Sequence, residues 1–424
     1  MAVMIFVAFV AVVLSMSFYF ARRAKSASGY YAAGGNIHWG VNGVAFAGDY
    51  LSAASFLGIC GMIATVGYDG FLYSIGYLAG WIVALFVVAE PMKRLGKYTF
   101  TDALDSKFNS KGIQLAAAIS TLIVSVFYLI PQMVGAGVLV TPLLGLPHAA
   151  GVIMVGAIVI GIVATAGMTS TTYVQFLKGG LLVIFALVIT VALLVRGLST
   201  EPDQGGSVPF HKYLTVETTE IDGVLQPPDA ESRIVSVATT PAGTFVRMAH
   251  QKKVGWFRKE QAEDRIRLHE TQWTSILPDG SKTVNGEPAV GQNQLRLVGN
   301  LEAIDGKTGD EARTGPVGPF EFLSKIGSDK TVVKTWKSTK FEDGGEKITA
   351  YYPTLSSGNK VMRPGQKFKI EGSPLEKFDF ISLMLALFLG TASLPHILIR
   401  YYTVRTPAAA RKSTIVAIAV IGLF

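Results

Sequence analysis

The sequence contains a single cysteine and few charged residues. Cys60 therefore has no partner within this chain for a disulfide, a CxxC redox pair or a cysteine-based zinc site. Charged residues make up 16% of the 424 positions, hydrophobic residues make up 50%, and the mean hydropathy is +0.40. A soluble protein of this length is less apolar and more highly charged. The composition therefore predicts a membrane protein that contacts the lipid bilayer.

Signals for nucleic-acid binding and for catalysis are also missing. The formal net charge is +8, but the basic residues occur in short runs beside apolar segments rather than on one basic module. This distribution argues against nucleic acid as a partner. Neither a Walker loop nor a nucleophile elbow is present, so no enzymatic activity is predicted.

Long hydrophobic runs dominate what is present. A bilayer core about 30 Å thick needs roughly 20 apolar residues in a helix. Seven stretches meet this requirement: approximately 1–20, 39–65, 71–90, 112–140, 148–168, 174–196 and 378–399. An eighth stretch begins at Ser413, and its residues up to Phe424 would reach only about 18 Å as a helix. We therefore expect an all-α polytopic membrane protein whose sequence stops inside a span.

The distribution of lysine and arginine predicts the orientation of these spans. Basic residues follow the first, third and seventh stretches, namely Arg22, Arg23, Lys25; Lys93, Arg94, Lys97, Lys107, Lys111; Arg400, Arg405, Arg411 and Lys412. The loops after the second and fourth stretches contain none. Because cytoplasmic loops are enriched in basic residues, we expect a multi-pass protein of the inner or plasma membrane with an extracytoplasmic N-terminus.

A polar segment separates the sixth and seventh stretches. The chain accordingly divides into 1–197 with six spans, 198–376 without any, and 377–424 with the seventh span and the start of the eighth. Alternating apolar and polar residues at 233–237 and 332–336 predict strands. We expect an inserted, β-rich extracytoplasmic domain. It shows no catalytic constellation, and its partner cannot be read from the sequence.

An aspartate lies within the second stretch. An ionised aspartate in the middle of a membrane helix costs about 3 kcal/mol, so Asp49 should face protein or water and mark an ion path. Gly48 precedes it and Ser52 and Ser55 follow, which favours a local break in the helix. Carbonyls freed at such a break can coordinate a cation. Alternatively, Asp49 caps the break or pairs with a cationic side chain.

The seventh stretch carries a second signal for a break. Pro395 removes a backbone donor, and Gly390, Thr391 and Ser393 lie just before it. Two interrupted helices in corresponding positions indicate a binding site at the bilayer midplane. The alternative is an ordinary proline kink.

Other polar residues inside or beside the spans allow two interpretations each. Tyr128 and Gln132 are four residues apart on one helix face, where they could hydrogen-bond a substrate or bridge two helices. His396 could relay protons, although bonding to carbonyls freed by Pro395 is the favoured interpretation. Arg400 is expected to anchor its helix at the cytoplasmic interface.

Four motifs together resemble the sodium:solute symporter family, specifically its cation/acetate symporter branch. They are GDYLSAASFLG at Gly48–Gly58, GKYTFTDALD at Gly96–Asp105, YLIPQMVGAG at Tyr128–Gly137 and GTASLPH at Gly390–His396. The resemblance covers residues 1–200 and 376–424. The inserted segment departs from the short loop that is usual in the family.

This resemblance implies a LeuT-like inverted-repeat fold, with a leading helix, a complete first repeat and a second repeat that is only begun. It implies sodium as the coupling ion, held by the carbonyls of Ala47 and Tyr50 with Asp49 beside them. It places the substrate, a small carboxylate such as acetate, near the residues Ser52, Tyr128, Gln132, Thr391 and Ser393. Proton coupling remains an alternative to sodium coupling.

Two other functions remain open from the sequence. The chain could be a membrane sensor whose extracytoplasmic domain binds a ligand and whose helices transmit the event. It could also be a truncated transporter fragment without activity.

Overall fold

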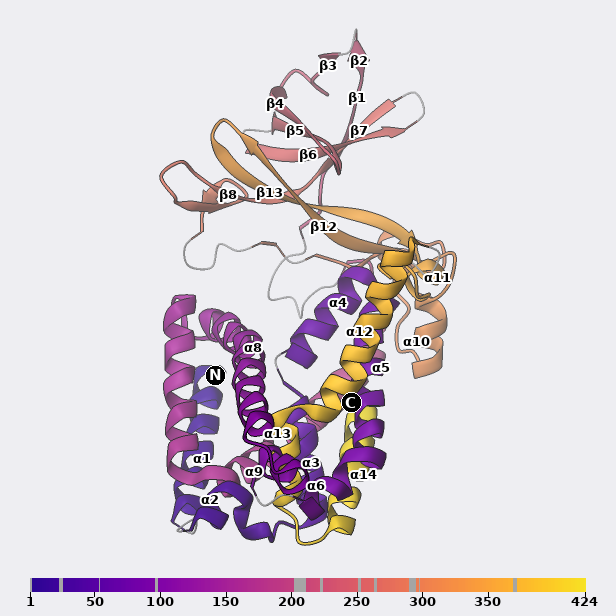
Figure 1. Ribbon diagram of the computed structural model, residues 1–424. Coiled ribbons are helices and arrows are strands. Elements are labelled where there is room, and N and C mark those ends of the chain that lie inside the picture. The colour runs from indigo at the N-terminus through magenta and orange to yellow at the C-terminus, as the bar shows by residue number, and fades with distance from the viewer. Residues whose placement is uncertain are drawn as a thin grey trace. The chain divides into compact units, whose positions relative to one another are not determined.

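The computed structural model describes residues 2–22, 26–52, 54–95, 98–201, 211–221, 224–250, 253–262, 265–289, 295–296, 298–368 and 372–424 (Figure 1). The chain forms two units. The helical unit comprises Met1–Leu193 and Pro364–Phe424, and the β-rich unit comprises Leu194–Arg363. The boundaries expected from composition, 197 and 376, lie 4 and 13 residues after the observed ones, Leu193 and Arg363.

The helical unit is built from the following helices: α1 Ala2–Ala21, α2 Ala27–Ala32, α3 Trp39–Tyr50, α4 Ile59–Val66, α5 Tyr68–Val83, α6 Ala89–Leu95, α7 Phe100–Phe108, α8 Lys111–Leu144, α9 His148–Arg196, α12 Pro374–Ser393, α13 Pro395–Leu398 and α14 Pro407–Leu423. The last residues of α9 belong to the β-rich unit. Short π-helical segments, Ala54–Gly58 and Ala84–Val88, precede α4 and α6.

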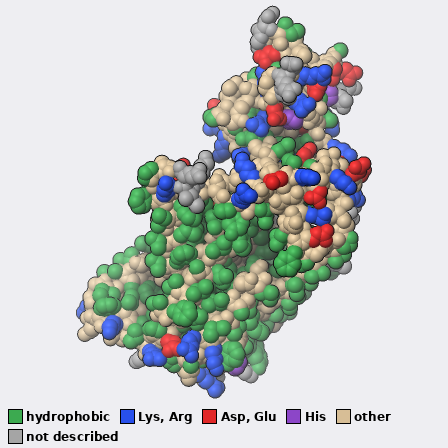
Figure 2. All heavy atoms as spheres, turned by 90° about the vertical axis from the view of Figure 1, so that its right-hand side faces the viewer, with side chains coloured by type: hydrophobic (Ala, Val, Ile, Leu, Met, Phe, Trp, Pro, Cys, Tyr) green, Lys and Arg blue, Asp and Glu red, His purple; other side chains and the backbone are tan. Residues whose placement is uncertain are grey.

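Six segments of the described chain qualify as membrane spans. Five are continuous: Val3–Ala21, Tyr68–Leu95, Lys111–Thr141, Gly167–Arg196 and Pro374–Tyr402. The sixth is the pair Trp39–Tyr50 and Ser55–Val66, which is bent by 55°. Hydrophobic side chains make up most of the helical unit's visible surface in Figure 2. Exposed apolar surface on this scale is stable in lipid rather than in water.

The expected fifth span, 148–168, is shorter among the described residues than the other spans. This part of α9 is a shorter apolar helix, His148–Ala164. Helix α9 is kinked at Gly167, which has φ 57° and ψ −152°, a conformation that favours glycine. A Cβ on Gly167 would lie 2.5 Å from the carbonyl oxygen of Tyr30, so α2 also approaches too closely for any other residue.

The last helix begins earlier than the sequence indicated. We expected a span from Ser413, but α14 begins at Pro407, where the side chain of Thr406 accepts a hydrogen bond from the Ala409 amide. Proline at the first position of a helix and threonine as N-cap both favour this start. Arg411 and Lys412, counted above as loop charges, therefore lie within the helix.

The predicted break in the second stretch is confirmed. Helix α3 ends at Tyr50, and Leu51 has φ −71° and ψ 78°, outside the helical region. The Ser55 hydroxyl donates to the Tyr50 carbonyl at 2.7 Å, and the Ser52 amide donates to the Ser55 hydroxyl at 2.9 Å. Small hydroxyl residues thus replace the helical hydrogen bonds at the break.

The break in the seventh stretch is also confirmed. Leu394 is extended, with φ −60° and ψ 124°, because the ring of Pro395 excludes a helical conformation at the preceding residue. The short helix α13 follows, and Ile399–Tyr402 continues it as a 3₁₀ turn.

Glycines bring the broken helices close to their neighbours. A Cβ on Gly48 of α3 would overlap the Gln175 carbonyl of α9. A Cβ on Gly80 of α5 would lie 2.6 Å from the Cβ of Thr391 in α12. Phe46, Trp81 and Tyr401 form the buried core between these helices.

The β-rich unit contains antiparallel sheets, and the expected strands at 233–237 and 332–336 are confirmed. One sheet has the order β1-β7-β6-β5-β4, with β1 Thr215–Thr218, β4 Arg233–Thr240, β5 Gly243–His250, β6 Lys253–Ala262 and β7 Arg265–Glu270. The second has the order β10-β9-β8-β13-β12-β11, with β8 Gln272–Ile276, β9 Lys282–Val284, β10 Glu287–Pro288, β11 Leu301–Ala303, β12 Val332–Asp343 and β13 Glu346–Ser357.

The unit is completed by a small β-ribbon and two helices. The ribbon consists of β2 Glu220–Ile221 and β3 Val224–Leu225, and the helices are α10 Pro319–Ile326 and α11 Gly358–Val361. Phe245, Trp256 and Trp273 belong to a buried aromatic core that includes residues of both larger sheets.

Candidate functional site

A small cavity of about 50 Å³ lies beside the two breaks of the helical unit. Its walls come from α3 and the residues after it, from α5, from α8, and from the region around Leu394. The lining residues are Tyr50, Ser52, Ser55, Tyr77, Trp81, Tyr128, Thr391, Leu394, His396 and Ile397. Two helix interruptions far apart in the sequence therefore contribute to one cavity.

Four of the predicted substrate and ion residues line this cavity: Tyr50, Ser52, Tyr128 and Thr391. Gln132 does not line the cavity, but it contacts a residue that does. Its Nε2 donates to the Ser52 hydroxyl at 3.2 Å. This bond joins α8 to the break after α3.

Ser393 is not among the lining residues. Its side chain is exposed, and its hydroxyl donates to the Leu389 carbonyl at 2.8 Å. Thr391 and Ser393 are two positions apart on a helix, so they lie on nearly opposite faces. Only Thr391 faces the cavity.

Three buried polar atoms of the lining have no hydrogen-bond partner among the described residues. They are Trp81 Nε1, Thr391 Oγ1 and His396 Nε2. Buried polar groups are nearly always paired, because an unpaired group loses its bonds to water. Three such atoms around one cavity indicate a site for a solute that accepts hydrogen bonds.

The sequence reasoning missed Trp81 and Tyr77, because aromatic residues in a span usually indicate packing. It also interpreted His396 as a partner of backbone carbonyls, whereas its Nε2 has no such partner in the described chain. The His396 ring instead packs against Tyr128, with 4.5 Å between the ring centroids.

Arg400 forms a buried bidentate ion pair with Asp49. Its Nε and Nη2 donate to the two carboxylate oxygens, the second at 3.0 Å, and its Nη1 donates to the Thr172 hydroxyl at 3.1 Å. The side chains of Arg400 and Asp49 are only 3% and 9% exposed. Asp49 therefore pairs with a cationic side chain, one of the alternatives that the sequence left open.

The expected role of Arg400 as an interface anchor was wrong. After the extended residue Leu394, the chain turns through α13 and the 3₁₀ segment, and Arg400 points into the bundle. A continuous helix would have carried it toward the membrane surface.

Lys178 of α9 adds a second cation to this region. Its charge interacts with those of Asp49 and Arg400, and His396 interacts electrostatically with all three. Lys178 has no carboxylate within ion-pair distance among the residues that the structure describes. Arg400 is thus balanced by Asp49, and Lys178 lies near both.

The carbonyls expected to bind sodium are already hydrogen-bonded. The Ala47 carbonyl accepts from the Leu51 amide at 2.8 Å, and the Tyr50 carbonyl accepts from Ser52 N at 2.8 Å and from Ser55 Oγ at 2.7 Å. All three expected ligands are oxygen atoms, which suits sodium. However, Tyr50 and Asp49 would have to exchange their present partners for the ion.

A model of the sodium:solute symporter family matches residues 30–243. The chain belongs to the sodium:solute symporter family. Members of this family are transporters rather than enzymes. The resemblance to the family is confirmed, and the match contains the first three motifs but not Gly390–His396. The matched residues include α3 to α9 and therefore the first break, Tyr128 and Gln132.

Two individual proteins are similar to parts of the chain. The uncharacterized symporter YwcA of Bacillus subtilis (strain 168) is 47% identical over 190 residues, which cover 45% of this chain. The aligned part spans 37% of that relative. A substrate-bound, outward-open structure of a Na+-coupled sialic acid symporter has a TM-score of 0.42 and 17% identity, covering 46% of this chain and 41% of that one.

Proposed function

We propose that the protein carries a small monocarboxylate such as acetate across the inner or plasma membrane together with sodium, and that the small cavity is its solute site. The observation that carries this proposal is the set of three unpaired atoms, Trp81 Nε1, Thr391 Oγ1 and His396 Nε2, in one cavity. The first two can donate, and His396 Nε2 can donate when it is protonated. A carboxylate offers several acceptor sites for such donors.

The size of the cavity supports a small solute. Its volume is about 50 Å³, whereas sites for drug-sized ligands have roughly 300–1,000 Å³. Acetate has only a few non-hydrogen atoms.

For the coupling ion, we propose the carbonyls of Ala47 and Tyr50 and the carboxylate of Asp49. Sodium would replace the guanidinium of Arg400 at Asp49 and the hydroxyl of Ser55 at the Tyr50 carbonyl. The membrane potential contributes about 2.3 kcal/mol per charge for each 100 mV, which can drive accumulation of the solute. The two broken helices are proposed to occupy corresponding positions in the inverted repeats of a LeuT-like fold, with the N-terminus and the β-rich unit outside the cytoplasm.

The test compares two neighbouring hydroxyl residues in the protein reconstituted into lipid nanodiscs. Thr391→Val removes one unpaired hydroxyl and keeps the side-chain shape, whereas Ser393→Ala removes an exposed hydroxyl two residues away. Binding of radiolabelled acetate in sodium should weaken roughly ten- to hundredfold for Thr391→Val, because a hydrogen bond to a charged group contributes about 1.5–3 kcal/mol. It should stay unchanged for Ser393→Ala.

Equal acetate affinity of the parent and Thr391→Val proteins would contradict the assignment of the cavity. Replacing sodium by potassium at constant ionic strength separates sodium coupling from proton coupling. Acetate binding should then fall, and binding that depends on pH but not on sodium would favour protons instead.

A further inference from the structure

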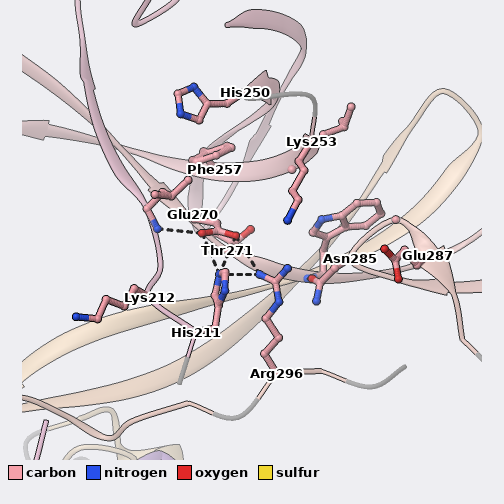
Figure 3. A pocket seen from close by; sticks show the side chains of 15 residues that line it. His211, Lys212, His250, Lys253, Phe257, Glu270, Thr271, Asn285, Glu287 and Arg296 are labelled. Atoms are coloured by element: carbon pink, nitrogen blue, oxygen red, sulfur yellow. Dashed lines mark hydrogen bonds and ion pairs between the residues drawn. The ribbon is translucent and has the colours of Figure 1, made fainter. Parts of the chain in front are cut away.

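The β-rich unit contains a second and much larger pocket, of about 490 Å³ (Figure 3). It is formed by the segment before β1, by β6, by the end of β7, and by the loops around Asn285 and Arg296. Leu214, Val254 and Phe257 contribute apolar side chains to its walls.

An ion pair in this pocket is held by several hydrogen bonds. Arg296 Nη1 donates to Glu270 Oε1 at 3.1 Å, and the Leu214 amide donates to Glu270 Oε2 at 2.9 Å. The backbone of Arg296 is fixed on both sides by Gln272, which accepts from its amide and donates to its carbonyl. His211 Nε2 lies 2.7 Å from Arg296 Nη1.

This arrangement leaves several donors available to a ligand. Glu270 is fully engaged, but Arg296 Nε and Nη2 donate to no described residue. The Asn285 Oδ1 accepts from the Trp273 amide at 3.0 Å, which orients its side-chain amide group and leaves the NH₂ free to donate. Figure 3 shows Lys253 extending toward the Glu270–Arg296 pair, while Lys212 points away from it.

The charges of the pocket favour an anion. The charges of Glu270 and Arg296 compensate each other, and Lys212 pairs with Glu201 at 3.2 Å. Lys253 has no acidic partner within ion-pair distance among the described residues. Glu287, the other acid of the lining, lies beyond Asn285 in Figure 3. Lys253 and the free edge of Arg296 are therefore the cationic groups presented to a ligand.

We infer that this pocket binds an organic carboxylate with an apolar body, larger than acetate, whose carboxylate group contacts Arg296 and Lys253. The free Nε and Nη2 of the guanidinium match the two oxygens of a carboxylate. The apolar walls would cover the rest of the ligand, and the volume lies within the range of small-molecule sites, roughly 300–1,000 Å³. This assignment does not depend on the function proposed for the helical unit.

The experiment measures binding of radiolabelled benzoate to the full chain in lipid nanodiscs by equilibrium dialysis. Lys253→Gln removes the unpaired cation on an exposed side chain, and should weaken benzoate binding roughly five- to tenfold, as expected for a charge contact at a partly exposed site. Lys212→Gln is the matched control, because Lys212 lines the same pocket but points away, and should leave the affinity unchanged. Arg296→Lys keeps the charge opposite Glu270 but removes the guanidinium fork, and should weaken benzoate binding to a similar extent.

Competition by unlabelled compounds identifies the chemistry of the ligand. Benzoate should compete, whereas benzyl alcohol, which lacks the charge, and inorganic phosphate, which lacks the apolar body, should compete at least tenfold more weakly. Thermal unfolding checks that the variants are folded, and Thr391→Val, in the helical unit, should leave benzoate binding unaffected. Equal affinity of the parent and Lys253→Gln proteins, or equal competition by benzyl alcohol or by phosphate, would overturn the inference.

Discussion

Asp49 and Arg400 are 351 positions apart in the sequence, yet they form a bidentate ion pair between the two broken helices. Each carboxylate oxygen of Asp49 accepts one hydrogen bond from the guanidinium, and Thr172 accepts a third. Because both side chains are almost fully buried, the pair links the region after Leu394 to the end of α3. It also occupies the carboxylate that we propose for sodium.

Removing one member of this pair should destabilise the helical unit strongly. Asp49→Asn or Arg400→Gln leaves a buried charge without its partner, which typically costs about 3–5 kcal/mol. The double variant Asp49→Asn/Arg400→Gln leaves no such charge, so its loss of stability should be smaller than the sum of the two single losses. Unfolding by sodium dodecyl sulfate in mixed micelles measures all four proteins. Strictly additive losses would show that the two side chains are not coupled in the membrane protein.

Substitutions of Asp49 and Arg400 should shift the sodium dependence of acetate binding in opposite directions. If sodium and Arg400 compete for Asp49, Asp49→Asn should raise the sodium concentration needed for half-maximal acetate binding, because the ion loses a ligand. Arg400→Gln should lower it, because the carboxylate is freed. A sodium titration of acetate binding in nanodiscs tests both directions. Shifts in the same direction, or no shift at normal protein yield, would contradict a shared site.

The close approach of α3 and α9 provides a third prediction. A Cβ on Gly48 would overlap the Gln175 carbonyl, which is backbone and cannot rotate away. Gly48→Ala should therefore lower the unfolding free energy by about 1–3 kcal/mol, the usual cost of overpacking. A methyl group on Gly61 in α4 would meet no atom within 4 Å, so Gly61→Ala is the control. That substitution should be neutral or stabilising, since alanine is favoured over glycine in helices by up to about 1 kcal/mol.

Local chemistry explains which features were predictable from the sequence. Both helix breaks depend on residues next to them, Ser52 and Ser55 in one case and Pro395 in the other, and both were predicted. The strands of the β-rich unit were predicted where polar and apolar residues alternate, as in β4 and β12. Their pairing was not, because β13 pairs with β8 on one side and β12 on the other, and such register depends on distant segments.

The candidate site was predictable only in part, for the same reason. Tyr50, Ser52, Tyr128 and Thr391 were selected because each carries a polar group at or near a break or on the face of a span, and all four line one cavity. Their role in binding stays a prediction. The inward position of Arg400 depends on the path of the chain after Leu394. The residues next to Arg400 in the sequence do not reveal this path. Lys178 lies within the sixth stretch, and only the packed bundle brings it near Asp49.

The last prediction concerns the segment between α9 and α12. It asks which part of this segment the helical unit needs in order to fold. Asp69 at the start of α5 is fully buried, and its carboxylate accepts hydrogen bonds from three backbone amides, those of Gly365, Lys367 and Phe368. These residues follow the β-rich unit in sequence but belong to the helical unit. Hydrogen bonds to a charged group contribute about 1.5–3 kcal/mol each. The helical unit should therefore need this short segment in order to fold, although it should not need the β-rich unit.

Two deletions separate these possibilities. Replacing Leu198–Arg363 by a flexible glycine-serine linker keeps the three amides, and should preserve the thermal stability of the helical unit and its binding of acetate, because the cost of closing a loop changes slowly with its length. Extending the replacement through Phe368 removes the amides and leaves a buried carboxylate unpaired, so it should abolish stable folding in the membrane. Asp69→Asn, introduced into the variant that lacks only Leu198–Arg363, weakens the hydrogen bonds to the three amides without removing the segment. It should lower the melting temperature of that variant. If both replacements were equally stable, Asp69 would not depend on this segment, and if both failed to fold, the helical unit would require the β-rich unit itself.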